Sequence, residues 1–151
     1  MSDIGLEIKG LRETQQRMEK IVADLHGTPF VNAMRDATLG VQRAAKIKAP
    51  VDTGRLRASI WPEVRQSGNE TTGVVGSIVK YAGYVELGTR PHFVSAAHIG
   101  RWAKRHGFGY TGLKVSGKAQ PYLQPALEEN AGRVARKLDD AVAHIINRSG
   151  E

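Results

Sequence analysis

The sequence predicts a single α+β domain over residues 1–151, with a small antiparallel sheet packed by two or three long helices. Three observations predict this class: an alternating apolar segment near the N-terminus, two β-rich segments separated by a polar loop, and long segments with apolar residues at helical spacing. A chain of 151 residues is long enough to bury one substantial core. The chain contains no Cys, which excludes disulfides, zinc–thiolate sites and a Cys nucleophile.

The N-terminal part of the chain changes from strand to helix periodicity. Ile4, Leu6 and Ile8 alternate with small or charged residues, which predicts a short strand that completes the small sheet. From Leu11 the apolar spacing is that of a helix, and Gly27 is its expected stop. One face of that helix is apolar and contains Leu11, Met18, Ile21, Val22 and Leu25.

A second, longer helix is predicted to follow. Thr28 is its N-cap and Pro29 its first helical residue, and it ends before Pro50. Its narrow apolar stripe is rich in Ala and therefore suits close packing on a sheet or another helix: Phe30, Met34, Ala37, Val41, Ala44 and Ala45.

A turn is predicted after this helix. Pro50 precedes Asp52 and Thr53, and we expect the Asp52 side chain to accept hydrogen bonds from backbone amides. Gly54 is free to take a positive φ, which closes the turn.

A hairpin and a short helix are predicted next. Residues 56–61 and 72–80 have the composition of strands, and the polar residues 66–70 join them. Residues 81–87 predict a short helix or tight turn that Gly88 closes.

The last third of the chain is predicted to contain two helices around a linker. Residues 94–105 suit a helix, and the Gly-rich residues 107–118 suit a mobile linker. The last helix is expected after Pro125, and its apolar stripe runs from Ala126 and Leu127 to Ile145.

Basic residues cluster in this last third, within a net charge of +7. No acidic residue occurs between Glu86 and Glu128, and we expect residues at about 90–120 to form a mobile basic insertion. Such a segment could bind a polyanion, either nucleic acid or an acidic protein surface. The alternative is a basic loop that is simply solvated. Its bases are Arg90, Arg101, Lys104, Arg105, Lys114 and Lys118.

Three motifs resemble catalytic or ligand sites only superficially. Asp52-Thr53-Gly54 matches the aspartic-protease triplet, but it follows Pro50 rather than an apolar strand, so a turn is favoured. Residues 107–112 satisfy G-x-G-x-x-G without the strand-then-helix context of a dinucleotide site. His92, His98 and His106 lie near Glu86, but their spacings of six and eight residues do not stack on one helical face. We therefore predict no catalytic, cofactor or metal site.

The sequence does not favour a secreted or membrane-spanning protein. The N-terminus lacks the basic and apolar regions of a signal peptide, and no apolar run approaches the length of a bilayer span. We expect a soluble intracellular protein.

Three blocks of the sequence, taken in order, resemble the small tail-component proteins of tailed bacteriophages, which lie at the neck or tail-completion position. The first block is a turn leading into a strand, the second a short aromatic helix ending in Gly-Thr, and the third the entry into the last helix. The matching residues are Pro50, Asp52, Thr53, Gly54, Leu56, Ser59 and Ile60; Tyr81, Ala82, Tyr84, Val85, Glu86, Gly88 and Thr89; and Pro121, Leu123, Pro125, Ala126 and Leu127.

The resemblance implies a structural virion protein without turnover or cofactor. Copies are expected to form a ring at the head–tail junction or tail end, beside head-closure or connector proteins and the tail terminator or tail-tube proteins. This places the protein in the neck or tail of the virion, and in the host cytoplasm during assembly. The alternative is a basic nucleic-acid-binding module encoded in a prophage.

A physical mechanism follows from the same residues. The hairpin and the basic insertion are expected to dock on a neighbouring subunit, with the six bases and Trp102 facing that neighbour or the genome DNA. Glu86 is expected to pair with Arg55 or Arg57 near the turn.

Overall fold

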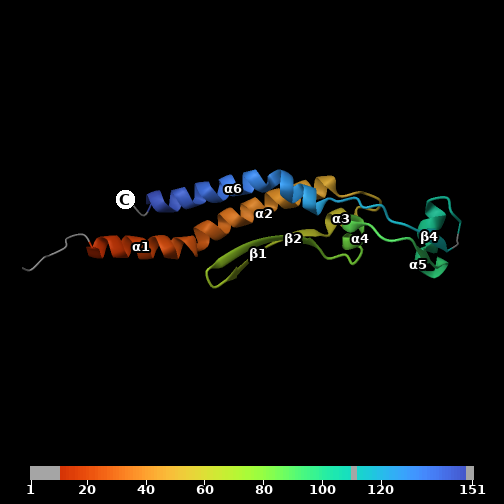
Figure 1. The fold of residues 1–151 in the computed structure, drawn as a ribbon, viewed down its shortest axis with the longest axis horizontal. Helices are drawn as coiled ribbons and strands as arrows, with labels where there is room; N and C mark the ends of the chain where they lie inside the picture. Colours follow the sequence, from red (N-terminus) through yellow and green to blue (C-terminus); the bar gives the residue numbers. More distant parts are fainter. Residues whose placement is uncertain (1–10, 110–111, 149–151) are drawn as a thin grey trace, which may run out of the picture. The chain divides into compact units, whose positions relative to one another are not determined.

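The protein has the predicted α+β class. The computed structural model describes residues 11–109 and 112–148, and Figure 1 shows their helices and strands. The strand predicted at residues 4–8 lies outside the described residues. In chain order the elements are α1 (Leu11–Leu25), α2 (Thr28–Lys48), α3 (Arg55–Ala58), β1 (Ile60–Ser67), β2 (Glu70–Ser77), α4 (Ala82–Leu87), β3 (His92–Val94), α5 (Ala96–Arg105), β4 (Leu113–Val115) and α6 (Leu123–Arg148).

The described residues form two compact units. Unit 1 contains residues 11–43, 62–75 and 128–148, and unit 2 contains residues 44–61, 76–109 and 112–127. The long elements α2, β1, β2 and α6 each contribute residues to both units. The expectation of one domain stays a prediction.

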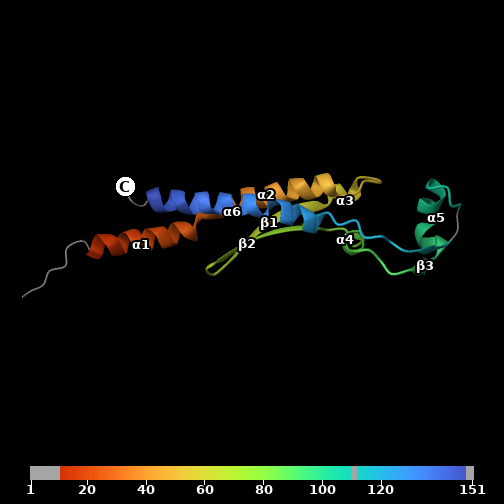
Figure 2. The same cartoon turned by 45° about the horizontal axis from the view of Figure 1, so that its top comes forward.

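Unit 1 is built on α2. Figures 1 and 2 both show α6 running beside α2 in this unit, and Asp36 and Gly40 of α2 line the same small cavity as Arg133 of α6. The hairpin packs on α2 through Gly73, because a Cβ atom there would collide with the Thr38 side chain. The buried residues of the described part of this unit are Ala37, Thr38, Val41, Asn130 and Ile145.

The two N-terminal helices lie where the sequence predicts them, although α2 begins at Thr28, one residue before the predicted first helical residue Pro29. α1 ends at Leu25, just before Gly27, and α2 begins at Thr28 and ends at Lys48. The apolar face predicted for α1 is only partly covered, since Met18 is 58% exposed and Val22 51% exposed.

The predicted strand at residues 56–61 is wrong in its first half. Residues Arg55–Ala58 form the one-turn helix α3, because Gly54 in the left-handed region turns the chain into a helical start. The strand begins at Ile60, and Gly68 and Asn69 alone join β1 to β2, a shorter connection than the predicted loop.

The predicted linker at residues 107–118 is also wrong in part. Leu113–Val115 form β4, which pairs antiparallel with β3, so that Phe93 lies opposite Lys114. The predicted helix at residues 94–105 begins at Ala96, since Val94 belongs to β3. The basic insertion therefore contains a strand–helix–strand excursion in unit 2, although its mobility stays a prediction.

The last helix begins earlier than predicted. α6 starts at Leu123, so Pro125 lies in its first turn, where the missing N–H breaks no helical hydrogen bond. Leu127 was expected in the buried stripe but is 56% exposed. Among the described residues, no helix is long and apolar enough to span a membrane.

Candidate assembly surface

The turn before α3 has the backbone geometry that the sequence predicts. Gly54 has φ 77° and ψ −6°, a left-handed conformation, and its carbonyl accepts the hydrogen bond from the Ala58 amide at 2.9 Å. Asp52, in the same turn, points a carboxylate oxygen to within 3.7 Å of His106 Nε2. The turn therefore contacts the end of α5.

We expect Gly54→Val to lower the free energy of unfolding by about 1–2 kcal/mol or more, because a β-branched residue is strained at positive φ. No atom lies within 4 Å of a Cβ built at Gly54, so the strain is in the backbone alone. Gly54→Asn is the matched control, since Asn tolerates the left-handed region. Chemical denaturation measures both, and equal stability of the Val variant and the wild type would contradict this turn.

Glu86 of α4 caps the last helix. Its carboxylate accepts hydrogen bonds from the backbone amides of Tyr122 at 2.8 Å, Leu123 at 2.9 Å and Gln124 at 2.9 Å. The predicted pairing of Glu86 with Arg55 or Arg57 is therefore wrong. The free amides of a helix N-terminus are better partners for a half-buried carboxylate than mobile guanidinium groups, because they are fixed and lie at the positive end of the helix dipole.

These contacts change two pKa values. Burial raises the pKa of Glu86, but the backbone hydrogen bonds from Leu123, Tyr122 and Gln124 outweigh it, so the pKa lies below its usual value. Burial and the charge of Glu86 raise the pKa of the Tyr122 phenol, whose side chain is fully buried. Glu86 is therefore ionised at neutral pH and Tyr122 is neutral.

A second contact closes the base of the β3–α5–β4 excursion. The Thr89 amide donates to the Gly117 carbonyl at 2.8 Å, and the Gly117 amide donates to Thr89 Oγ1 at 2.8 Å. Gly88 has φ 77°, and a Cβ atom there would lie 2.8 Å from the Gly117 oxygen. The close contact between the chain leaving α4 and the returning chain at Gly117 therefore requires Gly at position 88, and Thr89 supplies its hydrogen bonds.

The turn, α3, α4, β3, α5 and the segment between β4 and α6 line an apolar groove in unit 2, a cavity of about 790 Å³. The Gln120 amide donates to the Val85 carbonyl at 2.8 Å and holds the return segment against α4. The side chains that line this groove include Leu56, Tyr81, Val85, Val94, Ile99 and Trp102.

Trp102 lies at the edge of this groove rather than in the core. It is 39% exposed, and its ring lies 4.6 Å from that of His106 and 6.1 Å from that of Phe108. The buried residues of α5 are instead Gly100 and Ala103. The small residues Gly100 and Ala103 are therefore the buried part of α5, whereas Trp102 lines the groove and is partly exposed.

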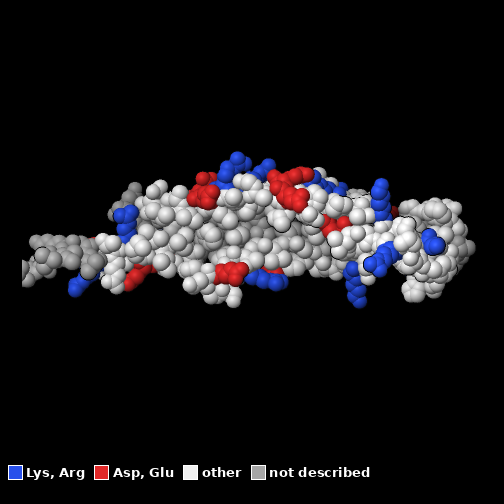
Figure 3. Space-filling view, in the orientation of Figure 1, with Lys and Arg blue, Asp and Glu red and all other residues white. Residues whose placement is uncertain are grey.

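Unit 2 is strongly basic. Asp52 and Glu86 are its only acidic residues, and both face partners within the unit, His106 and the amides of α6. Figure 3 shows Lys and Arg around the β3–α5–β4 excursion, with Asp and Glu concentrated elsewhere on this face. The basic residues of the unit are Lys46, Lys48, Arg55, Arg57, Lys80, Arg90, Arg101, Lys104, Arg105, Lys114 and Lys118.

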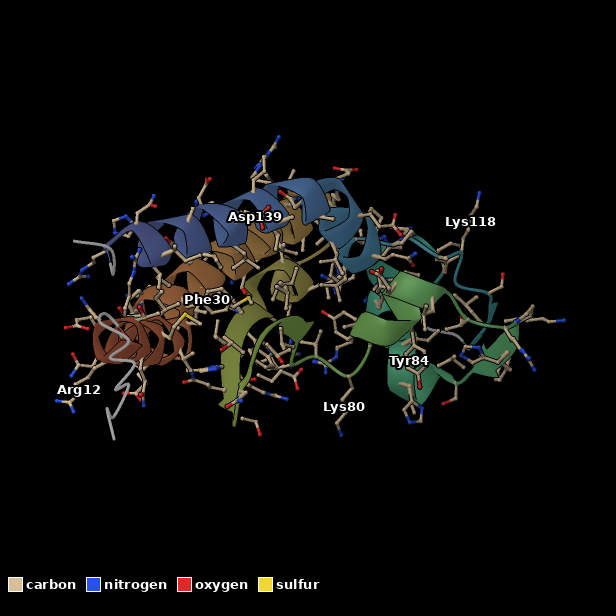
Figure 4. The ribbon with its side chains drawn as sticks, turned by 60° about the vertical axis from the view of Figure 1, so that its left-hand side comes forward. Arg12, Phe30, Lys80, Tyr84, Lys118 and Asp139 are labelled. Carbon is tan, nitrogen blue, oxygen red and sulfur yellow. The ribbon has the colours of Figure 1, made fainter. Side chains whose placement is uncertain are left out.

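Large apolar side chains are exposed beside these bases. Tyr84 and Leu87 of α4, Phe93 of β3 and Ile78 are all exposed. Figure 4 shows the Tyr84 and Lys118 side chains extending away from the ribbon. Exposed aromatic and aliphatic groups of this size are typical of interaction surfaces.

The three sequence blocks thus meet in unit 2. The turn block lines the groove, the α4 block lines it and supplies Glu86, and the third block supplies the amides that Glu86 binds. The histidines do not converge: the His92 ring lies against the Arg90 carbonyl and the His98 ring against Ser95.

Sequence reasoning missed Val94 and Ile99 as groove residues. It also missed the capping role of Glu86, although a signal for it was present. Residues 117–122, immediately before Leu123, include no Ser, Thr, Asp or Asn, so the N-terminus of α6 has to be capped from elsewhere in the chain.

One protein-family model matches just over half of the chain. Residues 12–88 match a family model described as "Bacteriophage HK97-gp10, putative tail-component". The match extends from α1 to Gly88, and so includes the turn block and the α4 block except Thr89, while the third block lies outside it. No curated protein and no solved structure matches the chain.

Proposed function

Because the chain belongs to the bacteriophage HK97-gp10-like family of tail components, we propose that it is a structural protein at the head–tail junction or tail end. In this proposal several copies form a ring that completes the tail and joins it to the head. Its neighbours are head-closure or connector proteins on one side and tail terminator or tail-tube proteins on the other. It acts in the virion neck or tail and assembles in the host cytoplasm, without a cofactor or catalytic turnover.

The observation that carries this proposal is the surface of unit 2. There the apolar groove, the exposed aromatic residues of α4 and β3, and an excess of Lys and Arg lie together. A surface with these properties supports binding to protein neighbours rather than chemistry on a small substrate.

Light scattering over a concentration series, with negative-stain imaging, tests ring formation. We expect large species with a defined mass and a central hole, either in the purified protein or after adding heads or tails. Monomers alone under all three conditions would contradict the ring.

Charge reversal on α5 tests the basic surface. Arg101, Lys104 and Arg105 are exposed, so we expect their triple substitution with Glu to leave the melting temperature nearly unchanged. We expect the same variant to reduce infectious titre by a factor of about 100 or more, because like charges across an interface are strongly unfavourable. Arg133, Arg136 and Lys137 on α6 form the charge-matched control triple. Normal titre from the α5 variant would contradict a role for this surface.

A second candidate function is contact with nucleic acid, favoured by the eleven bases that unit 2 carries against two acids. In that case the purified protein binds double-stranded DNA without sequence preference, and the logarithm of its affinity falls linearly with the logarithm of salt concentration. Loss of this binding in the α5 triple variant, together with normal assembly, favours the DNA-contact function. Blocked assembly with unchanged DNA binding favours the protein interface.

A further inference from the structure

We propose that the groove of unit 2 binds helix α1 of a second copy, so that neighbouring subunits join head to tail. This inference rests on the proposed function, because it names the contact that builds the ring. It concerns two surfaces that are only partly covered within a single chain: the groove of unit 2 and one face of α1.

The first surface is the groove, which offers mainly apolar side chains and one guanidinium group, that of Arg55. Arg57 and Arg101 do not line the groove, but they are exposed on α3 and α5, next in sequence to the lining residues Leu56 and Trp102. Within the described residues these three Arg side chains make no ion pair. An occupant with an apolar stripe and a carboxylate fits such a groove.

The second surface is the uncovered face of α1. Met18 and Val22 are separated by one helical turn and are both more than half exposed. Glu19 lies beside them and is itself exposed, and Gln15 donates a hydrogen bond to its carboxylate at 3.0 Å. Two apolar anchors at i and i+4 with an adjacent carboxylate match the requirements of the groove.

Charge determines the direction of the contact. The described residues of unit 1 carry as many acidic as basic residues, whereas unit 2 carries eleven bases and two acids. Two copies of unit 2 facing each other would therefore repel, but unit 1 approaches unit 2 without this penalty. A contact between two different surfaces is heterologous, and repeating it closes a ring when the rotation between subunits allows closure.

Because the chain has no Cys, single introduced cysteines test the contact cleanly. Chains carrying Val22→Cys are mixed with chains carrying Ile99→Cys and oxidised, and the linked dimer is quantified. Lys20→Cys is the control, since Lys20 is exposed on the opposite face of the same helix. Circular dichroism and thermal melting check that each variant is folded.

We expect the Val22–Ile99 mixture to give at least about tenfold more linked dimer than the Lys20–Ile99 mixture, because a disulfide requires Cα atoms within about 7 Å. Equal yields from the two mixtures would overturn the inference. A chain carrying both Val22→Cys and Ile99→Cys that forms an internal disulfide at high dilution would assign the groove to its own helix, which also overturns it.

The same experiment separates this inference from the proposed ring. If the wild-type protein forms rings but the Val22–Ile99 mixture gives no more linked dimer than the Lys20–Ile99 mixture, the α1 contact is overturned and the ring is retained. Linked dimers that never close into a ring, even with heads or tails added, would retain the contact and contradict the ring.

Discussion

Replacing Gly88 with Ala is expected to lower the free energy of unfolding by about 3–5 kcal/mol, the largest effect of any single substitution considered. Gly88 has φ 77° and ψ 178°, a region that is almost restricted to glycine. The added Cβ would also lie 2.8 Å from the Gly117 oxygen and 2.9 Å from the Ala119 nitrogen, which are backbone atoms that cannot rotate away. We expect the melting temperature to fall by about 10 °C or more.

Gly83→Ala is the matched control for this prediction. Gly83 lies in α4, and a Cβ atom built there has no neighbour within 4 Å. Because Ala favours a helix more than Gly does, the control is expected to be neutral or up to about 1 kcal/mol more stable. Similar melting temperatures for the Gly83 and Gly88 variants would show that the segment of Gly117 and Ala119 does not pack on Gly88.

Replacing Glu86 with Ala is expected to destabilise the protein by about 2–3 kcal/mol at neutral pH. The change leaves the amides of Tyr122, Leu123 and Gln124 without their acceptor, and it removes a negative charge from the positive end of the α6 dipole. Glu86→Gln retains an acceptor oxygen but loses the charge, so its effect is expected to be about half as large. Denaturant unfolding measures both variants.

The same carboxylate predicts a pH dependence. Since the pKa of Glu86 is lowered in the folded protein, its stabilising contribution is complete above the usual pKa of a glutamate and is lost as the pH falls through the lower folded value. The stability difference between wild type and Glu86→Gln should therefore shrink in acid. The exposed Glu70, converted to Gln, is the control. A difference that stays constant down to pH 2 would contradict the capping role of Glu86.

The helices were the most predictable part of this fold. α1 and α2 have long apolar periodicity and clear stop signals at Gly27 and Pro50, and these local features define their ends. The short elements were less predictable. Residues Arg55–Ala58 have strand-like composition, but the conformation of Gly54 makes them helical, and Leu113–Val115 form a strand only because β3 lies beside them.

The motifs of the candidate site could be predicted from the sequence, but their convergence in one part of the structure could not. The turn block, the α4 block and the start of α6 are separated by tens of residues. The hydrogen bonds that join the α4 block to the chain before α6 involve backbone groups of Gly117, Gln120 and Tyr122. A backbone amide has no residue-specific signature, so the pairing of Glu86 with the last helix could not be read from the amino-acid types alone. The missing N-cap residue indicates only that some acceptor is required.

The most direct test of the central claim is electron microscopy of particles from a phage genome that encodes this chain, with and without its reading frame. We expect the deletion to give DNA-filled heads and separate tails, and a supplied copy of the protein to restore joined, infectious particles. The wild-type particle should carry the protein at the neck or tail end, as shown by gold labelling. Intact, infectious particles assembled without the protein would contradict the account.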